Sequence, residues 1–110
     1  MNYYTIPGGG DMPNKAIMLR GHIQNAAKYF DVDPELIYKK SNKQNVVTMR
    51  QKLALVLKWN GYKLKEIGRA LGGKHHTTII HNQKEAVKFC GTEKDYYFDC
   101  IELSKHLKIK

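Results

Sequence analysis

Two adjacent glycines, Gly72 and Gly73, are the feature that most constrains how this chain can fold. They separate a short segment with helical apolar spacing, 64–71, from a second such segment that begins near residue 76. A glycine pair lets the backbone turn sharply between two helices, and the second segment opens with the polar run Lys-His-His-Thr-Thr. The pattern predicts a helix-turn-helix over about 64–89. Its second helix would present hydrogen-bonding groups at its N-terminus, as helices that read the major groove of DNA do.

Capping residues and apolar spacing predict five to six helices and no strand in the rest of the chain. The expected ranges are 14–30, 33–40, 46–60, 64–71, 76–89 and 92–106. The clearest start is Asp33-Pro34-Glu35, where an Asp cap precedes a proline and an acid in the first turn. Asn45 is expected to cap the third helix, and Gly91 to end the fifth. We therefore expect an all-α fold, with a single domain over 13–110 after a flexible, glycine-rich leader at 1–12.

Apolar spacing also predicts which side chains the helices bury. The residues expected in the core are Val46, Met49, Leu53, Val56, Leu57, Leu64, Ile67, Leu71, Ile79, Ile80, Ala86 or Val87, Phe89 or Cys90, Phe98, Ile101, and Tyr97 or Leu103. Trp59 is expected to anchor the core or its edge. Cys90 and Cys100 are the only cysteines, and they lack the paired Cys-x-x-Cys spacing of a zinc site. They are most simply small buried apolar residues, and no metal is expected.

Basic residues are concentrated in the middle of the chain. The chain has 19 Lys and Arg against 10 Asp and Glu, a net charge of +9. Between Lys39 and Thr78 there are ten basic residues and one acid, Glu66, so this segment carries the whole excess charge. Cations beside a groove-reading helix bind phosphates and release condensed counterions, whereas a basic face alone is often only a solvated surface. The combination indicates a nucleic-acid partner.

Other classes of function find little support in the sequence. No apolar run approaches the ~20 residues that span a bilayer, and the N-terminus lacks the basic and apolar stretches of a secretory signal. The segment Gly72-Gly73-Lys74 lacks the first glycine and the hydroxyl residue of a phosphate-binding loop. No acid–base pair or activated nucleophile is evident either. We expect a cytoplasmic protein associated with the nucleoid, with no enzymatic activity, cofactor, bound nucleotide or membrane partner.

Two segments of the chain resemble one known family. Lys40-Ser-Asn-Lys-Gln-Asn-Val-Val-Thr-Met-Arg-Gln51 and Arg69-Ala-Leu-Gly-Gly-Lys-His-His-Thr-Thr-Ile-Ile-His81 are similar, at the same mutual spacing, to the signature of the C-terminal DNA-binding domain of the bacterial replication initiator DnaA. The resemblance extends over roughly residues 22–90. It implies an all-α fold of the Trp repressor type and double-stranded DNA as the partner, with replication proteins as further partners.

The resemblance also implies roles for individual residues. The residues expected to read bases are His75, His76 and Thr77. Those expected to hold the DNA backbone are Arg50, Gln51, Lys58, Lys74, Thr78 and His81. Those that correspond to the family's minor-groove loop are Lys40, Asn42 and Lys43. Two alternatives remain open, because Thr77 can instead cap the helix that follows it and His81 can instead pack at the edge of the core.

The chain departs from the family pattern at positions that would touch DNA. His75 replaces an acidic residue, so an acceptor for a cytosine amino group becomes an imidazole with one donor and one acceptor. Asn42 and Gln44 replace loop arginines, which a narrow minor groove attracts, and Lys74 replaces an arginine. We expect a free-standing module, without the initiator's ATPase, that binds DNA but does not favour the initiator's usual box.

Two functions are consistent with these features. The first is sequence-specific binding of double-stranded DNA, in replication initiation or its regulation. The alternative is a protein-interaction adaptor or replication antagonist that kept the fold and lost sequence-specific recognition. The His-Thr-Thr run and the basic segment favour the first function, whereas the neutral loop residues Asn42 and Gln44 favour the second.

Overall fold

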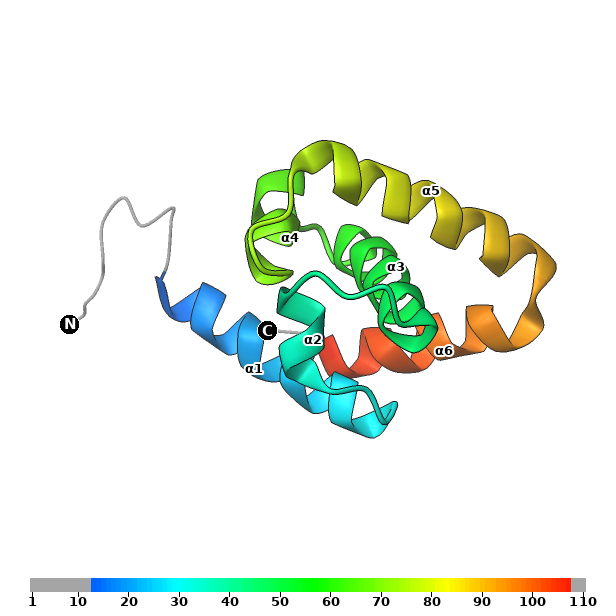
Figure 1. Cartoon of the computed structure of the whole chain (residues 1–110), viewed down its shortest axis with the longest axis horizontal. Helices are drawn as coiled ribbons and strands as arrows, with labels where there is room; N and C mark the ends of the chain where they lie inside the picture. The colour runs from blue at the N-terminus through cyan, green and yellow to red at the C-terminus, as the bar shows by residue number, and fades with distance from the viewer. Residues whose placement is uncertain (1–12, 108–110) are drawn as a thin grey trace.

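The computed structural model of the chain describes residues 13–107, which form six α-helices and no strand (Figure 1). The helices are α1 (Pro13–Tyr29), α2 (Pro34–Tyr38), α3 (Gln44–Trp59), α4 (Leu64–Ala70), α5 (His76–Thr92) and α6 (Lys94–Leu107). This confirms the predicted all-α fold. The predicted leader, 1–12, and the last three residues of the predicted domain, 108–110, lie outside the described residues.

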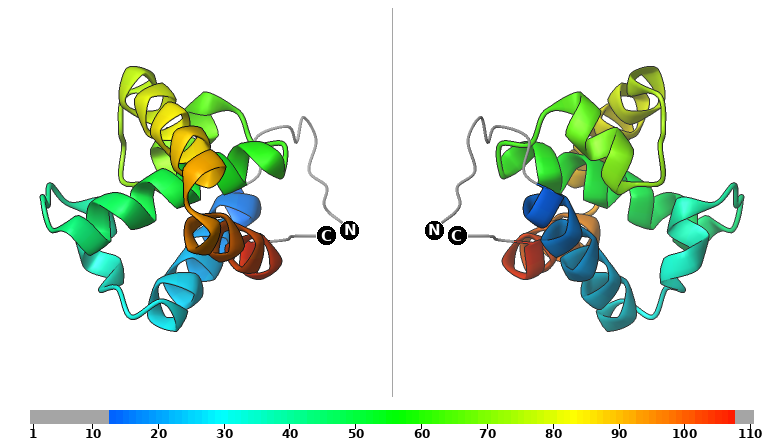
Figure 2. Two further views of the ribbon diagram at one scale, coloured as in Figure 1. Left: turned by 90° about the vertical axis from the view of Figure 1, so that its right-hand side faces the viewer. Right: turned by 90° about the vertical axis from the view of Figure 1, so that its left-hand side faces the viewer.

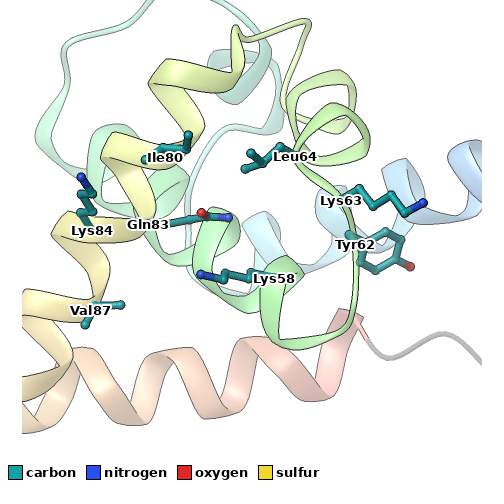
Figure 3. A pocket seen from close by; sticks show the side chains of 8 residues that line it. All are labelled: Lys58, Tyr62, Lys63, Leu64, Ile80, Gln83, Lys84 and Val87. Atoms are coloured by element: carbon teal, nitrogen blue, oxygen red, sulfur yellow. The ribbon is translucent and has the colours of Figure 1, made fainter.

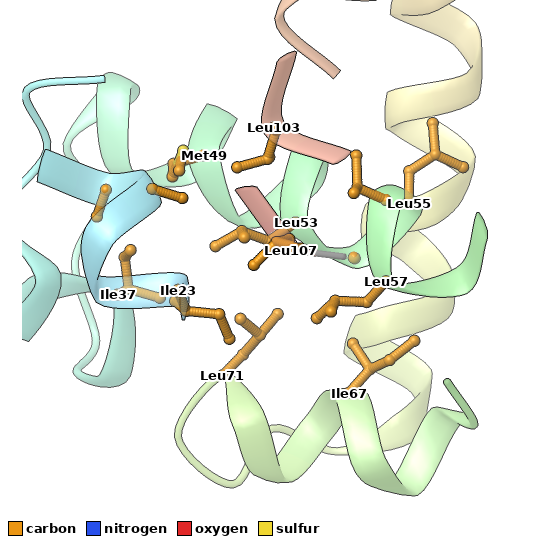
Figure 4. Packing of buried hydrophobic residues seen from close by; sticks show 14 of the residues in the cluster. Ile23, Ile37, Met49, Leu53, Leu55, Leu57, Ile67, Leu71, Leu103 and Leu107 are labelled. Carbon is orange, nitrogen blue, oxygen red and sulfur yellow. The ribbon is translucent and has the colours of Figure 1, made fainter. Parts of the chain in front are cut away.

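The central helix α3 is covered on most of its faces. In Figure 1 it lies between α5 and α6, and it packs against α2 and α4 as well. The predicted apolar stripe is buried, and Ala54 and Leu55 on the other faces are buried too. Figure 4 shows side chains from α1, α2, α4 and α6 converging on Leu53 and Leu57. Burial of a helix on several faces by separate neighbours cannot be read from a single amphipathic stripe.

The start of α3 differs from the prediction. The helix begins at Gln44, two residues before the expected start, and Asn45 lies in its first turn rather than at its cap. The backbone carbonyl of Lys43 accepts hydrogen bonds from the amides of Val46, at 3.0 Å, and Val47, at 2.9 Å. The first turn is therefore already closed around Asn45. The predicted cap of α2 is confirmed, since Oδ1 of Asp33 accepts a hydrogen bond from the backbone N–H of Glu35 at 3.0 Å.

The boundary between α5 and α6 also differs from the prediction. Gly91, expected to end α5, lies inside it, and the helix continues to Thr92. The hydroxyl of Thr92, expected to cap α6, instead donates to the carbonyl of Lys88 at 3.2 Å. One non-helical residue, Glu93, joins the two helices. Its N–H donates to Phe89 at 2.7 Å, and its carbonyl accepts from Tyr97 at 3.2 Å.

The face that helix α6 presents to the core matches the prediction only in part, because Cys100 and Leu103 are buried as expected whereas Phe98 is not. Phe98 is 54% exposed, and the buried residues are Tyr96, Cys100, Leu103 and Leu107. These positions recur at helical spacing, so the sequence held two overlapping stripes. The hydroxyl of Tyr96 donates to the buried Oε1 of Gln51 in α3 at 3.1 Å, a contact that favours the observed face. On α5 the open choice is resolved in favour of Ala86, because Val87 is 58% exposed.

The turn between α4 and α5 depends on backbone approaches that only glycine permits. Gly72 has φ +93°, and a Cβ placed there would lie 2.5 Å from the carbonyl oxygen of Tyr38. In α4, the carbonyl of Gly68 accepts hydrogen bonds from Gly73, at 2.8 Å, and Lys74, at 2.9 Å. A Cβ on Gly68 would lie 2.4 Å from the carbonyl oxygen of Lys74. The predicted glycine turn is confirmed, and its direction fixes where α5 begins.

Candidate nucleic-acid interface

Two segments far apart in the sequence form one side of the molecule. They are the loop between α2 and α3, residues 39–43, which we call the basic loop, and the start of α5 with the preceding residues, 74–78, which we call the tip. Both views in Figure 2 show the basic loop and the turn that leads into α5 on the same side. The helix-turn-helix prediction therefore holds, and it brings the predicted base-reading residues next to the predicted minor-groove loop.

Cationic groups from three elements converge between the tip and the basic loop. The pKa of Lys74 is lowered by burial and by the neighbouring positive charges of Arg50 and Lys40. Such mutual repulsion between cations is relieved when an anion is bound among them. The start of an α-helix adds unpaired backbone N–H groups that also attract anions. This arrangement is suited to a phosphate of a nucleic-acid backbone.

His75 is the N-cap of α5, a role that sequence reasoning did not assign to it. Its Nδ1 accepts a hydrogen bond from the backbone N–H of Thr77 at 3.2 Å, and the Oγ1 of Thr77 lies 3.1 Å from the same nitrogen. An accepting Nδ1 leaves the proton of the neutral ring on Nε2. The capping atom at this terminus therefore belongs to His75, and no hydrogen bond joins Thr77 Oγ1 to the amides of Ile79 and Ile80, which are among the described residues.

The residues at the start of α5 are exposed, and the residue that follows them is buried in the core. His75, His76, Thr77 and Thr78 are all exposed. The rings of His75 and His76 lie 4.2 Å apart between centroids, and the fully buried Ile79 follows them. Polar side chains are thus presented to solvent at a helix N-terminus, which is the part of a reading helix that contacts base edges.

Arg50 is directed into the protein rather than outward. Its Nε donates to the carbonyl of Ile37 at 3.1 Å, its Nη1 to Ser41 at 2.9 Å, and its Nη2 to Leu36 at 2.7 Å. Nη2 also donates to the carbonyl of Lys39. Four of the five guanidinium donors are therefore engaged, and burial lowers the pKa of Arg50. In the free protein this geometry gives Arg50 a role in holding the basic loop, and its predicted contact with the DNA backbone stays a prediction.

Gln51 also makes an internal contact in the free protein. Its side chain is 9% exposed and is bonded to Tyr96 of α6, so it contributes to the packing of α3 on α6. The predicted DNA-backbone contact of Gln51 stays a prediction. The resemblance to the family pattern matches the residue types at these two positions, but it does not show in which direction the two side chains point.

The remaining predicted residues are at the surface. Lys40, Asn42 and Lys43 of the basic loop are exposed, and so are Lys58 at the end of α3 and His81 on α5. The exposure of His81 excludes the alternative that it packs at the edge of the core. Lys58 lines a groove together with residues of α5 and of the segment that leads into α4, and no residue of the tip or of the basic loop lines that groove. The structure thus brings together the tip and the basic loop, whereas Lys58 belongs to a different surface feature.

Two further properties bear on the kind of site. In the part of the chain that the structure describes, no three His, Cys, Asp or Glu side chains are arranged to hold a metal ion. None of the described helices combines the length and the apolar character needed to cross a membrane.

Comparison with known proteins gives one family. The family model described as the bacterial DnaA protein helix-turn-helix matches residues 22–85. The chromosomal replication initiator protein DnaA of Bacteroides fragilis is 30% identical over 95 residues, covering 86% of this chain and 20% of that protein. That of Cutibacterium acnes is 28% identical over 104 residues, covering 94% and 20%, and that of Lacticaseibacillus casei is 34% identical over 83 residues, covering 74% and 18%. The chain thus spans about a fifth of the length of these relatives. It belongs to the bacterial DnaA helix-turn-helix family.

Proposed function

We propose that this domain binds double-stranded DNA sequence-specifically, in replication initiation or its regulation. The observation that carries the proposal is the exposed tip beside a convergence of cations from α3, the basic loop and the turn. Membership of a helix-turn-helix family whose relatives are named as replication initiators supports the same function. The hydrogen bonds of Arg50 to the basic loop also support it, because they hold this loop on the side where the tip lies.

Individual roles follow from exposure and position. His76 and Thr77 would contact base edges, the Thr77 methyl group being suited to the methyl group of thymine. Lys74, Thr78 and His81 would contact phosphates, together with the free backbone N–H groups of the first turn of α5. Lys58 would contact the backbone further from the tip. The exposed basic loop, with Lys40, Asn42 and Lys43, would approach the neighbouring minor groove.

The cap at His75 leads to a specific base preference. Because Nδ1 accepts from Thr77, Nε2 of the neutral ring is a donor on an exposed side chain of the tip. A donor seeks an acceptor such as O6 or N7 of guanine, whereas a carboxylate seeks the amino group of cytosine. We therefore propose that His75 favours a purine acceptor at the base pair where an acidic residue would favour cytosine.

Selection of bound duplexes from a random pool is expected to enrich a defined sequence. His75→Asp retains a capping acceptor, so the domain stays folded, and it should move the preference at one position towards cytosine. Thr77→Ala should relax the preference at one position. Each change is expected to alter discrimination by about 1–3 kcal/mol. The measurement is the set of enriched sequences for the three proteins, followed by binding titrations on duplexes that differ at one base pair.

Lys74→Ala provides a control with a different expected result. Loss of a phosphate contact should weaken binding to all sequences equally. It should also reduce the slope of log affinity against log salt concentration by about one, which corresponds to one counterion fewer released. An unequal effect across sequences would contradict a backbone role for Lys74. If no sequence is enriched, specific reading is excluded and the function as a protein-interaction adaptor is favoured instead.

A further inference from the structure

A groove lies along α5 beyond the tip, between this helix and the segment that joins α3 to α4. It has a volume of about 650 Å³, within the range of pockets that hold ligands. Its lining residues, shown in Figure 3, are Lys58, Tyr62, Lys63, Leu64, Ile80, Gln83, Lys84 and Val87. Sequence analysis singled out Lys58 alone among the charged residues here, and no role described above uses the groove as a whole.

The surface of the groove between its charged residues is mainly apolar. Leu64 and Ile80 are half-buried, and Val87 is 58% exposed although it lies on a helix with a well-packed inner face. Gln83 is the buried polar residue of the lining, and its Nε2 donates to the carbonyl of Ala54 at 3.2 Å. One of the two N–H groups of its side-chain amide is therefore already engaged in the fold. The groove offers an apolar surface to a ligand.

Lysines surround this apolar surface. Lys58, Lys63 and Lys84 line the groove, and no acidic side chain does. Among the described residues, neither Lys58 nor Lys84 makes an ion pair, whereas lysines elsewhere on α3 and α5 do. Lys52 lies 2.7 Å from Asp99, and Lys88 lies 3.7 Å from Glu85. Lys58 and Lys84 therefore bring positive charge to the groove that no ion pair among the described residues neutralises, while the carboxylate of Glu66 lies beside Tyr62 and Lys63.

We propose that this groove binds an acidic amphipathic peptide segment of a partner protein, with apolar side chains on Leu64, Ile80 and Val87 and carboxylates on the lysines. A helix that lays an apolar face into such a groove is a common mode of peptide recognition, and complementary charge would orient it. Duplex DNA fits these features less well. A phosphate would be bound by the lysines but would gain nothing from the exposed apolar side chain of Val87. In addition, reading helices contact bases mainly with their first turns, whereas the groove lies further along α5.

Occupation of the groove would oppose DNA binding. This consequence rests on the proposed function, because Lys58 belongs both to the groove and to the proposed backbone contacts. A peptide carboxylate on Lys58 would neutralise the charge that a phosphate otherwise meets. Binding of the peptide and binding of the duplex would then show negative cooperativity, each lowering the affinity of the protein for the other.

The test uses the full chain without DNA and a labelled synthetic peptide of about 16 residues, long enough to form a helix on binding. Its leucines recur at helical spacing on one face, and glutamates fill the other positions. Fluorescence anisotropy is expected to show binding, and amide chemical shifts to change at residues that line the groove. Lys84→Glu and Val87→Ser should each weaken binding about tenfold. Both residues are exposed, so the variants should keep the wild-type circular dichroism spectrum.

Matched controls separate the groove from general charge attraction. Lys88→Glu changes an exposed lysine on the same helix outside the groove, and Phe98→Ser removes an exposed apolar side chain on α6. Both should leave peptide affinity within about twofold. The proposal is overturned if the amphipathic peptide does not bind, if a peptide with its leucines scattered binds equally, or if Lys88→Glu has the effect of Lys84→Glu. It is also overturned if Lys84→Glu weakens duplex binding while the peptide fails to bind.

Discussion

Replacing Gly68 by alanine is expected to lower the free energy of unfolding by about 2–3 kcal/mol. The added Cβ would lie 2.4 Å from the carbonyl oxygen of Lys74, and this neighbour is backbone rather than the end of a mobile side chain. Either α4 or the turn must move, which also weakens the two hydrogen bonds that Gly68 accepts from Gly73 and Lys74. Urea unfolding followed by circular dichroism measures the change.

Gly91→Ala is the matched control for this prediction. Gly91 is also helical, but a Cβ there meets nothing within 4 Å. Alanine has the higher helix propensity, so this substitution should stabilise the protein by about 0.5–1 kcal/mol. If Gly68→Ala lowers and Gly91→Ala raises the free energy of unfolding, the loss at Gly68 comes from the contact between α4 and the turn. Equal effects at Gly68 and Gly91 would contradict that contact.

Arg50→Ala is expected to destabilise the free protein by about 2–3 kcal/mol, because carbonyls at the end of α2 and in the basic loop lose their shared donor. The side chain links Leu36, Ile37, Lys39 and Ser41 to α3, so its loss should also release the basic loop. Arg50→Lys keeps the charge but lacks the planar fork, and it should restore less than half of the lost stability. Thermal and urea unfolding without DNA give the stability change, and amide exchange in residues 39–43 reports on the loop.

The comparison with DNA-bound protein distinguishes the two roles considered for Arg50. A simple phosphate contact would leave the stability of the free protein unchanged, and Arg50→Lys would recover most of the affinity for DNA. Arg69, which is exposed on α4, provides the control substitution. Arg69→Ala should change stability by less than about 0.5 kcal/mol. A free protein as stable after Arg50→Ala as after Arg69→Ala would refute the loop-holding role.

Local signals in the sequence predicted much of the fold. Asp33 was correctly identified as a cap, because its hydrogen bond to Glu35 spans only two residues. The glycine turn was also predicted, because Gly72 and Gly73 adopt positive φ angles that other residues rarely adopt. The buried stripe of α3 was also predicted, since one apolar face is enough to reveal it. The signal for each of these features lies within one short segment of the sequence.

Features that depend on distant segments were not predicted. The internal hydrogen bonds of Arg50 and Gln51 were not predicted, because their partners come from α2, the basic loop and α6, which no spacing within α3 reveals. Phe98 was expected in the core, whereas the packed face of α6 carries Tyr96, which was not expected there, beside Cys100, which was. Gly91 was expected to end α5, but no turn with positive φ forms there and the helix continues.

The single-residue junction at Glu93 has a consequence for the way this domain would meet its partner. Glu93 shares backbone hydrogen bonds with both α5 and α6, and α6 in turn packs on α1 and α3. The reading helix is thereby anchored at its far end as well as at the glycine turn. A helix fixed at both ends loses little conformational entropy on association and adjusts little to a mismatched surface. Deformation during complex formation would then fall mainly on the duplex, so that its bendability contributes to which sites are chosen.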